Sequence, residues 1–234
     1  RRRGPARGNG SGPDRGATVL RTPLYQFHVD HGAKMVDFAG WEMPLVYMRD
    51  GAGGITEEHL QVRRSGGLFD VSHMGRFRVS GRHSVRLLER VCTRKIRDMK
   101  AQACRYSLVC NERGGVHDDV IVMRIDEDDF IVVVNASNRE KLLGHFRGVI
   151  AAESLVVKLD DTTMSTAMVA VQGPKVMEMV SKFSREIPTL KRYTFAVKNL
   201  LVVKLYVSRT GYTGEDGVEV ILPAAMMGMA MKML

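Results

Sequence analysis

Two neighbouring acidic residues, Asp118 and Asp119, follow a glycine turn and enter the apolar run 120–122. Successive side chains on a strand point to opposite faces of the sheet. One carboxylate should therefore face a cleft or the core and the other solvent or the turn, and the alternation puts Asp119 on the face of His117 and Ile121. A carboxylate among apolar neighbours has a disfavoured charge and can handle protons. An acidic pair that only caps the turn would have the same sequence.

A second segment, residues 208–219, combines three glycines within seven residues with Arg209, Tyr212 and Glu219. Glycines let a backbone approach a ligand closely, and the polar side chains supply directional hydrogen bonds. The phosphate-loop pattern GxxxxGK[ST] is absent, and the acids favour a cationic or amide-bearing group over phosphate. An ordinary hairpin connection is the alternative.

The histidines near acidic or hydroxyl residues give weaker signals. Ser72 and His73 follow Asp70, which suggests a catalytic triad, but the GxSxG turn of such hydrolases is absent. We therefore predict a structural role for His73. His28 and His31 are one helical turn apart, yet no carboxylate or cysteine cluster completes a ligand set, so no metal site is predicted.

The elements that would position these residues follow from periodicity and turn signals. Thr22-Pro23 and Gly32 bound one predicted helix, and Ile55 and Leu60 form a predicted hydrophobic staple on the next. Predicted helices cover residues 22–31, 56–65, 84–92, 138–146 and 174–183 and a segment after 223; predicted strands cover residues 69–79, 104–110, 116–124, 130–134, 155–159, 164–171, 201–208 and 218–222. Helices and strands mix without strict βαβ alternation, so the predicted fold class is α+β.

Residues 1–17 differ in composition from the rest, because they hold five arginines and one acid and almost no large apolar side chain. Such a segment cannot bury enough surface to fold. We therefore predict a disordered basic tail at residues 1–17, followed by one domain over residues 18–234. A solvated tail or upstream translation artefact, a mitochondrial transit peptide and a nucleic-acid-binding arm are its possible meanings. The segment lacks the serines and apolar face of a transit peptide and the aromatic residues of such an arm.

The composition of the whole chain of 234 residues is that of a globular protein, with 44% apolar residues, 26% charged residues and a net charge of +9. No apolar run approaches the roughly 20 residues of a membrane-spanning helix. Three cysteines without a CxxC pair argue against a disulfide framework or a zinc site; they are Cys92, Cys104 and Cys110.

Seven segments, taken in order, resemble the glycine cleavage T-proteins, a family of aminomethyltransferases. They are residues 21–25, 34–41, 68–74, 111–122, 134–136, 171–174 and 209–217. The resemblance extends from about residue 20 to residue 234. It implies a folate-binding aminomethyltransferase fold with two related subdomains built on mixed or antiparallel sheets. Family members continue into a C-terminal β-barrel domain, so we expect this chain to lack that domain and to show weak or no activity as given.

The resemblance also implies a reaction. In this family an aminomethyl-derived carbon passes from the lipoyl group of the partner H-protein to the co-substrate tetrahydrofolate, with release of ammonia and formation of methylene-tetrahydrofolate. Glycine catabolism and one-carbon metabolism are the expected context. Neither a nucleic acid nor a membrane is an expected partner. The expected location is the bacterial cytoplasm or, in a eukaryote, the mitochondrial matrix.

The resemblance assigns roles to particular residues. Asp119 matches the family's key carboxylate, which orients the folate and favours attack of its nitrogen on the aminomethyl carbon. Glu219 matches the acid that holds the pterin amino and ring N–H groups. The remaining matched positions line the folate cavity; they are Met74, Tyr106, Asn135, Tyr193 and Tyr212.

Three alternative functions remain open. A related folate-dependent demethylase, or the folate domain of a sarcosine or dimethylglycine oxidoreductase, would share the fold. A folate-binding accessory protein of iron–sulfur assembly would also share it, but such proteins carry Lys-Gly-Cys-Tyr-x-Gly-Gln where this chain has Arg-Thr-Gly-Tyr-Thr-Gly-Glu at residues 209–215. A basic nucleic-acid-binding protein is the third, and it depends on the arginine-rich tail alone.

Overall fold

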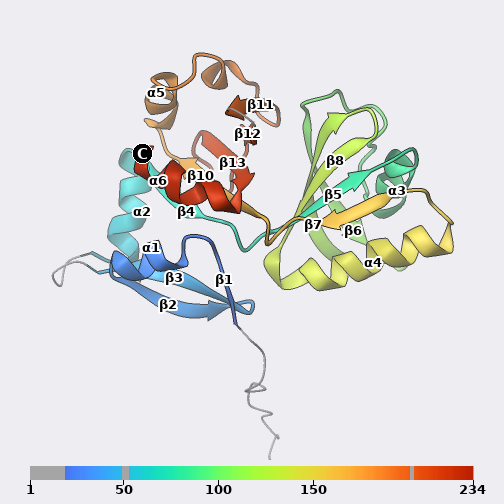
Figure 1. The fold of residues 1–234 in the computed structure, drawn as a ribbon, viewed down its shortest axis with the longest axis horizontal. Coiled ribbons are helices and arrows are strands. Elements are labelled where there is room, and N and C mark those ends of the chain that lie inside the picture. The colour runs from blue at the N-terminus through green and yellow to red at the C-terminus, as the bar shows by residue number, and fades with distance from the viewer. Residues whose placement is uncertain (1–18, 49–52, 201–202, 234) are drawn as a thin grey trace, which may run out of the picture.

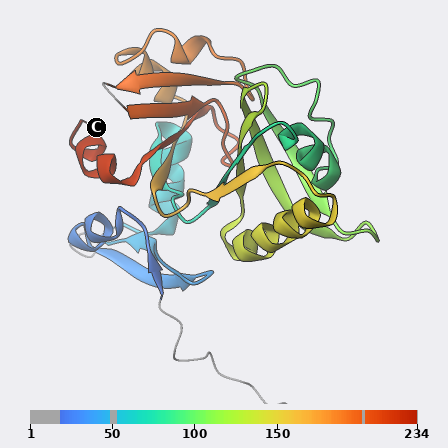
Figure 2. The ribbon, with the colours of Figure 1, turned by 45° about the vertical axis from the view of Figure 1, so that its right-hand side comes forward.

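The computed structural model describes residues 19–48, 53–200 and 203–233. The basic tail predicted at residues 1–17 lies outside these ranges. The described residues form three β-sheets with helices packed against them. Figures 1 and 2 both show the small N-terminal sheet below a second sheet, with the third sheet to one side. The predicted α+β class is confirmed.

The sheet that contains the paired aspartates, here called the β7 sheet, has the order β6-β7-β8-β5-β9 and is antiparallel throughout. Its elements are β5 (Gly75–Ser80), α3 (Ser84–Val91), β6 (Cys104–Cys110), β7 (Val116–Asp126), β8 (Asp129–Val134), α4 (Arg139–Ala152) and β9 (Lys158–Asp161). Alternate strand residues such as Phe77, Val122 and Val132 pack against Leu88 of α3 and Phe146 of α4. These two helices therefore bury one face of the sheet.

The sheet that carries the glycine-rich segment, here called the β13 sheet, has the order β11-β12-β13-β10-β4. Its elements are β4 (Gly67–Asp70), β10 (Thr166–Gln172), α5 (Val176–Ser181), β11 (Phe195–Leu200), β12 (Val203–Ser208), β13 (Gly217–Pro223) and α6 (Met227–Met233). Alternate residues such as Val169 and Val218 pack under the helices, and Met168 and Ile221 point the other way. The second set meets Ile121 and Met123 of the β7 sheet, so the two sheets pack face to face.

The N-terminal sheet has the order β1-β3-β2 and supports two helices. Its elements are β1 (Leu20–Arg21), α1 (Tyr25–Asp30), β2 (Ala33–Phe38), β3 (Trp41–Tyr47) and α2 (Ile55–Arg64). Helix α1 ends before Gly32, whose φ of +73° is left-handed, as the sequence predicts. Within the described ranges, no helix has both the length and the apolar character needed to cross a membrane.

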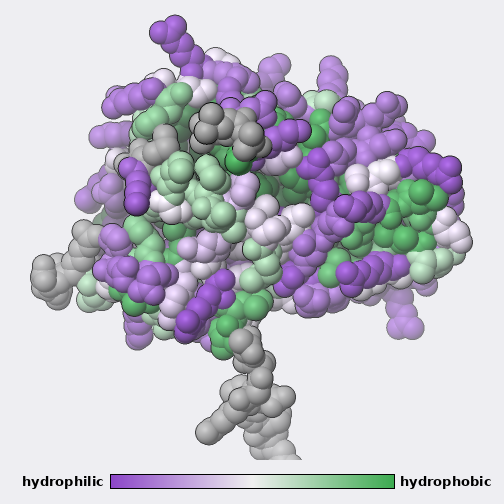
Figure 3. Space-filling model, viewed as in Figure 1, coloured by the Kyte–Doolittle hydropathy of each residue, from purple (hydrophilic) through white to green (hydrophobic). Residues whose placement is uncertain are grey.

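Several predictions about these elements need correction. The predicted staple is wrong, because Ile55 and Leu60 are both exposed. The single strand predicted over residues 69–79 is two strands in different sheets, since the chain turns at residues 71–74. The strands β1 to β3 and β11 were not predicted. On the face shown in Figure 3, hydrophilic residues predominate, with smaller apolar areas between them.

Candidate functional site

A cavity of about 450 Å³ lies between the β7 sheet and the β13 sheet. One wall comes from β6 and β7, and the other comes from the glycine-rich segment and β13. Its lining residues are Tyr106, Asp119, Ile121, Tyr193, Thr210, Gly211, Tyr212, Gly214 and Glu219. Residues separated by more than a hundred positions therefore meet because the two sheets pack face to face.

The two aspartates of β7 have different surroundings. Asp118 is buried on the helix-covered side, where it accepts hydrogen bonds from the Asn135 backbone N–H (3.0 Å), Asn135 Nδ2 (2.8 Å) and Asn138 Nδ2 (2.7 Å). Asp119 faces the cavity, and its Oδ1 accepts a hydrogen bond from Asn135 Nδ2 at 2.9 Å. The alternation thus sends one carboxylate to a cleft as predicted, and the other is held by asparagines instead of facing solvent.

His117 does not share the face of Asp119, which corrects the expectation from strict alternation. Val109 pairs with Asp118 and Cys110 pairs with Val116, so His117 is the extra residue of a β-bulge. The bulge turns its ring toward α4, where its centroid lies 5.1 Å from that of His145. His117 therefore lines a different surface hollow from Asp119.

Glu219 is a buried acid on the opposite wall, and the residue is 4% exposed. Its Oε2 accepts a hydrogen bond from the Thr210 hydroxyl, which also lies 2.7 Å from Ser208 Oγ. Burial raises the pKa of the Glu219 carboxyl above its ordinary value. A carboxylate desolvated in this way binds a donor-rich ligand more strongly than a solvated one.

Gln172 shapes the glycine-rich segment, although sequence reasoning gave it no role. Its amide donates to the carbonyls of Thr210 (3.1 Å) and Val218 (3.3 Å), and its Oε1 accepts from the Thr213 hydroxyl (3.1 Å). A Cβ on Gly211 would lie 1.9 Å from Gln172 Oε1, so a larger residue there would have to displace this amide. A lone polar residue at the end of an apolar strand run, opposite a glycine-rich loop, is the signal that could have found it.

The structure brings five of the seven predicted site residues to one cavity: Asp119, Tyr106, Tyr193, Tyr212 and Glu219. Partial desolvation and the nearby Asp119 carboxylate both raise the pKa of the Tyr106 phenol. Asn135 lies behind Asp119 as its hydrogen-bond donor. Met74 packs into the apolar layer between the sheets and does not line the cavity. Their roles in ligand binding stay predictions.

The triad that Asp70, Ser72 and His73 suggest in the sequence, and that was not predicted, is not assembled. His28, not His73, pairs with Asp70, at 3.0 Å, and its other ring nitrogen lies 2.6 Å from the Tyr47 hydroxyl. Ser72 Oγ donates to the Met168 carbonyl at 3.1 Å. Among the described residues, no group of three or more His, Cys, Asp or Glu side chains is placed to hold a metal ion.

Replacing Glu219 with glutamine should stabilise the fold at neutral pH. The raised pKa means that the folded state favours the protonated acid, so the free energy of unfolding falls as the pH rises from the ordinary pKa through the raised one. Glutamine stays neutral. The melting temperature of E219Q should exceed that of the parent at pH 7, and the difference should close below about pH 4. The exposed Glu178→Gln is the control, and it should show no such difference. Equal melting temperatures for E219Q and the parent at every pH would contradict this.

A family model described as the GCVT N-terminal domain matches residues 24–234. The chain belongs to the GCVT N-terminal domain family. The match includes both sheets that enclose the cavity, so the family assignment and the site concern the same residues.

Relatives of this GCVT N-terminal domain chain include aminomethyltransferases from Rubrobacter xylanophilus, 46% identical over 209 residues, and Thermotoga maritima, 41% identical over 207 residues. These alignments cover 89% and 88% of this chain but 54% and 55% of the relatives. The chain therefore spans about half the length of the curated relatives it matches.

Solved structures agree with the family. The glycine cleavage system aminomethyltransferase T of Bartonella henselae matches with a TM-score of 0.81 and 30% identity, over 92% of this chain and 56% of that one. A heterotetrameric sarcosine oxidase from Corynebacterium sp. U-96 matches with a TM-score of 0.57 and 12% identity, over 90% of both chains. The second likeness shows a shared fold and nothing of function.

Proposed function

We propose that this chain supplies the folate-binding part of an aminomethyltransferase that transfers an aminomethyl-derived carbon from a lipoyl H-protein to tetrahydrofolate. One observation carries the proposal: Asp119 and Glu219, from two facing sheets, line one cavity together with three tyrosine rings. A volume of about 450 Å³ lies within the usual range for small-molecule sites. The names of the relatives support the reaction class.

The chemistry of the walls matches a reduced pterin. A pterin presents an amino group and a ring N–H on one edge, and a buried carboxylate such as Glu219 can accept from both with charge-assisted hydrogen bonds. Tyr106, Tyr193 and Tyr212 offer aromatic faces to the flat ring. Glu219 would thus fix the orientation of the ring relative to Asp119 on the other wall.

Asp119 would act on the reacting end of the folate. In the transfer, the C–S and C–N bonds of the aminomethyl group break and two C–N bonds to the folate form. The two protons lost by the folate nitrogens go to the released ammonia and to the lipoyl sulfur. A carboxylate at Asp119 can accept a hydrogen bond from an attacking nitrogen and stabilise positive charge on the transferred carbon. Asn135 holds that carboxylate in place.

Binding of a reduced folate to the 234-residue chain tests the proposal. With 5-formyltetrahydrofolate as the probe in titration calorimetry, we expect saturable binding that E219Q weakens by about 10-fold or more, because one charged acceptor is lost. The exposed Glu178→Gln should bind as the parent does. E219Q is expected to be the more stable protein, so its weaker binding cannot come from unfolding. No binding by the parent, or equal binding by E219Q, would overturn the assignment.

A further inference from the structure

Two chain segments connect the β7 sheet to the rest of the described structure. Residues 71–74 lead from β4 into β5, and residues 162–165 lead from β9 into β10. Between them the chain remains in the β7 sheet and its helices. The second segment lies beside the start of β5, because the Thr162 backbone N–H donates to the Arg76 carbonyl at 2.9 Å. The placement of the β7 sheet against the β13 sheet therefore depends on how these two connections are held, together with the direct backbone hydrogen bonds from Cys104 to Tyr193 (2.7 Å) and from Phe195 to Gln102 (2.9 Å).

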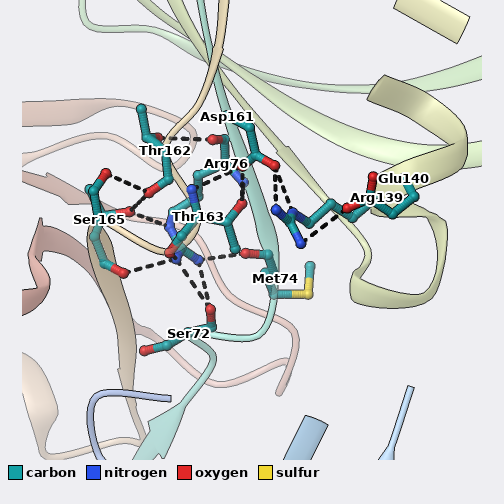
Figure 4. A network of polar contacts seen from close by, with 10 residues as sticks. Ser72, Met74, Arg76, Arg139, Glu140, Asp161, Thr162, Thr163 and Ser165 are labelled. Carbon is teal, nitrogen blue, oxygen red and sulfur yellow. Dashed lines mark hydrogen bonds and ion pairs between the residues drawn. The ribbon is translucent and has the colours of Figure 1, made fainter. Parts of the chain in front are cut away.

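The guanidinium of Arg76 binds both connections at once, as Figure 4 shows. It donates to the carbonyls of Ser72 (3.1 Å) and Met74 (2.5 Å) in the first connection. It also donates to the carbonyls of Thr163 (2.6 Å) and Thr166 (3.1 Å), and its Nε donates to Thr166 Oγ1 at 2.7 Å. A planar fork of N–H groups can satisfy acceptors on two sides in this way, and a lysine ammonium cannot.

Arg76 is fully buried, which is costly for a charged side chain. The neighbouring Asp161 is held by Arg139, at 2.5 Å between Arg139 Nη2 and Oδ2, and by Thr163. The Arg76 charge is therefore stabilised mainly by carbonyl and hydroxyl oxygens, and burial lowers its pKa to about 10. A buried cation that serves only packing could be replaced by an apolar side chain, whereas this one has oriented partners on both connections.

Contacts lead from Arg76 to the cavity. Met74, whose carbonyl Arg76 binds, packs with its side chain into the apolar layer between the sheets, where Ile121 also lies. Ile121 lines the cavity two residues after Asp119 on β7. Ser72, the other partner in the first connection, is bonded through its hydroxyl to Met168 of β10. Arg76 thus contacts both sheets through the residues that join them.

We propose that Arg76 is a positioning residue that sets the width of the cavity between Asp119 and Glu219, by holding the two connections in one arrangement. Its effect on ligand binding rests on the proposed function of that cavity. Its effect on the spacing of the sheets does not. Loss of the Arg76 contacts should widen the range of distances between the two carboxylates. A site that touches a ligand from both sides loses affinity when its groups are not held to within about 0.5 Å.

The experiment compares Arg76→Lys and Arg76→Met with Arg124→Met in the 234-residue chain. Arg124 is a matched control, because its guanidinium also donates to backbone carbonyls, those of Met99 (2.7 Å) and Glu127 (2.8 Å), but both lie in loops of the stretch between the two connections. Spin labels on cysteines introduced at Arg147 of α4 and at Lys182 after α5, both exposed, report the distance between the sheets, with Cys110 replaced by serine. Calorimetry with 5-formyltetrahydrofolate reports the affinity.

We expect both Arg76 variants to broaden the distance distribution and to weaken folate binding by about 10-fold. Arg124→Met should lower the melting temperature and leave both readouts unchanged. Arg76→Lys keeps the charge, so it remains informative if Arg76→Met fails to fold. A parent-like distance distribution in folded Arg76→Lys would refute the claim that Arg76 fixes the spacing of the two sheets. A broadened distribution with unchanged affinity would refute its role at the candidate site. Absence of folate binding by the parent would refute the proposed function. The measured distances would still test whether Arg76 fixes the spacing of the two sheets.

Discussion

Replacing Asp119 with asparagine should lower folate-dependent aminomethyl transfer by about 10²–10⁴-fold and leave the fold intact. Asparagine has nearly the same shape, and its Oδ1 can still accept from Asn135 Nδ2. It cannot take a proton or carry the negative charge that favours a cationic carbon. The measurement is the release of ammonia from aminomethyl-loaded H-protein in the presence of tetrahydrofolate, made in a polypeptide that contains this segment and performs the transfer.

The neighbouring Asp118→Asn is the control for this prediction. Asp118 accepts from Asn135 and Asn138 with both oxygens, so an amide NH₂ there would face a donor. We expect Asp118→Asn to reduce the free energy of unfolding by about 1–3 kcal/mol, with a much smaller loss of transfer per folded molecule than Asp119→Asn. Transfer by Asp119→Asn at half the parent rate or more would refute the role given to Asp119.

Replacing Gly173 with alanine should destabilise the protein by about 3–5 kcal/mol. Gly173 has a φ of +145°, which side-chain-bearing residues rarely adopt, and an added Cβ would lie 2.4 Å from the Gly66 Cα and 2.5 Å from the Ser65 carbonyl oxygen. Both obstacles are backbone atoms, so no rotamer change relieves the clash. The turn between β10 and α5 would have to move away from the end of α2. Urea denaturation measures the loss.

Gly148 on α4 provides the matched substitution. A Cβ there meets no atom within 4 Å, and the residue is exposed in the middle of a helix. Gly148→Ala should therefore increase the free energy of unfolding by about 0.5–1 kcal/mol. The same chemical change is thus expected to act in opposite directions at the two positions. A loss below about 1 kcal/mol for Gly173→Ala would show that the turn can relax.

Sequence periodicity predicted the β7 sheet best. Strands β6 to β8 are apolar runs with continuous burial through much of β7 and β8, and the turn at residues 111–115 separates the first two. Strands β2 and β3 were missed because their burial is irregular: β2 is largely exposed, and Pro44 and Leu45 interrupt the pattern in β3. Irregular burial gives no period to detect.

The sequence predicted the cavity-facing carboxylate of the candidate site but not the residues that hold the site in place. Alternation was sufficient to separate Asp118 from Asp119, because the strand pairs regularly from there to Arg124. Alternation gave the wrong face for His117, one residue before Asp118, because no residue type in the sequence indicates the β-bulge there. Gln172 and Arg76 act through backbone atoms of segments distant in the sequence. Such partners become visible only when the two sheets are placed against each other.

The meeting of the two connections at Arg76 has a consequence for engineering. The buried core between the β7 sheet and helices α3 and α4 draws all its members from residues 77–159. That stretch begins and ends at one place, where the Arg76 carbonyl accepts from Thr162. A stretch with its own core and adjacent ends has the architecture of a domain inserted into another domain. The remaining chain can be joined across the insertion point without it. The stretch could be excised and closed with a short linker, carrying Asp119 with it, but its face with Ile121 and Met123 would then lose the apolar cover of the β13 sheet.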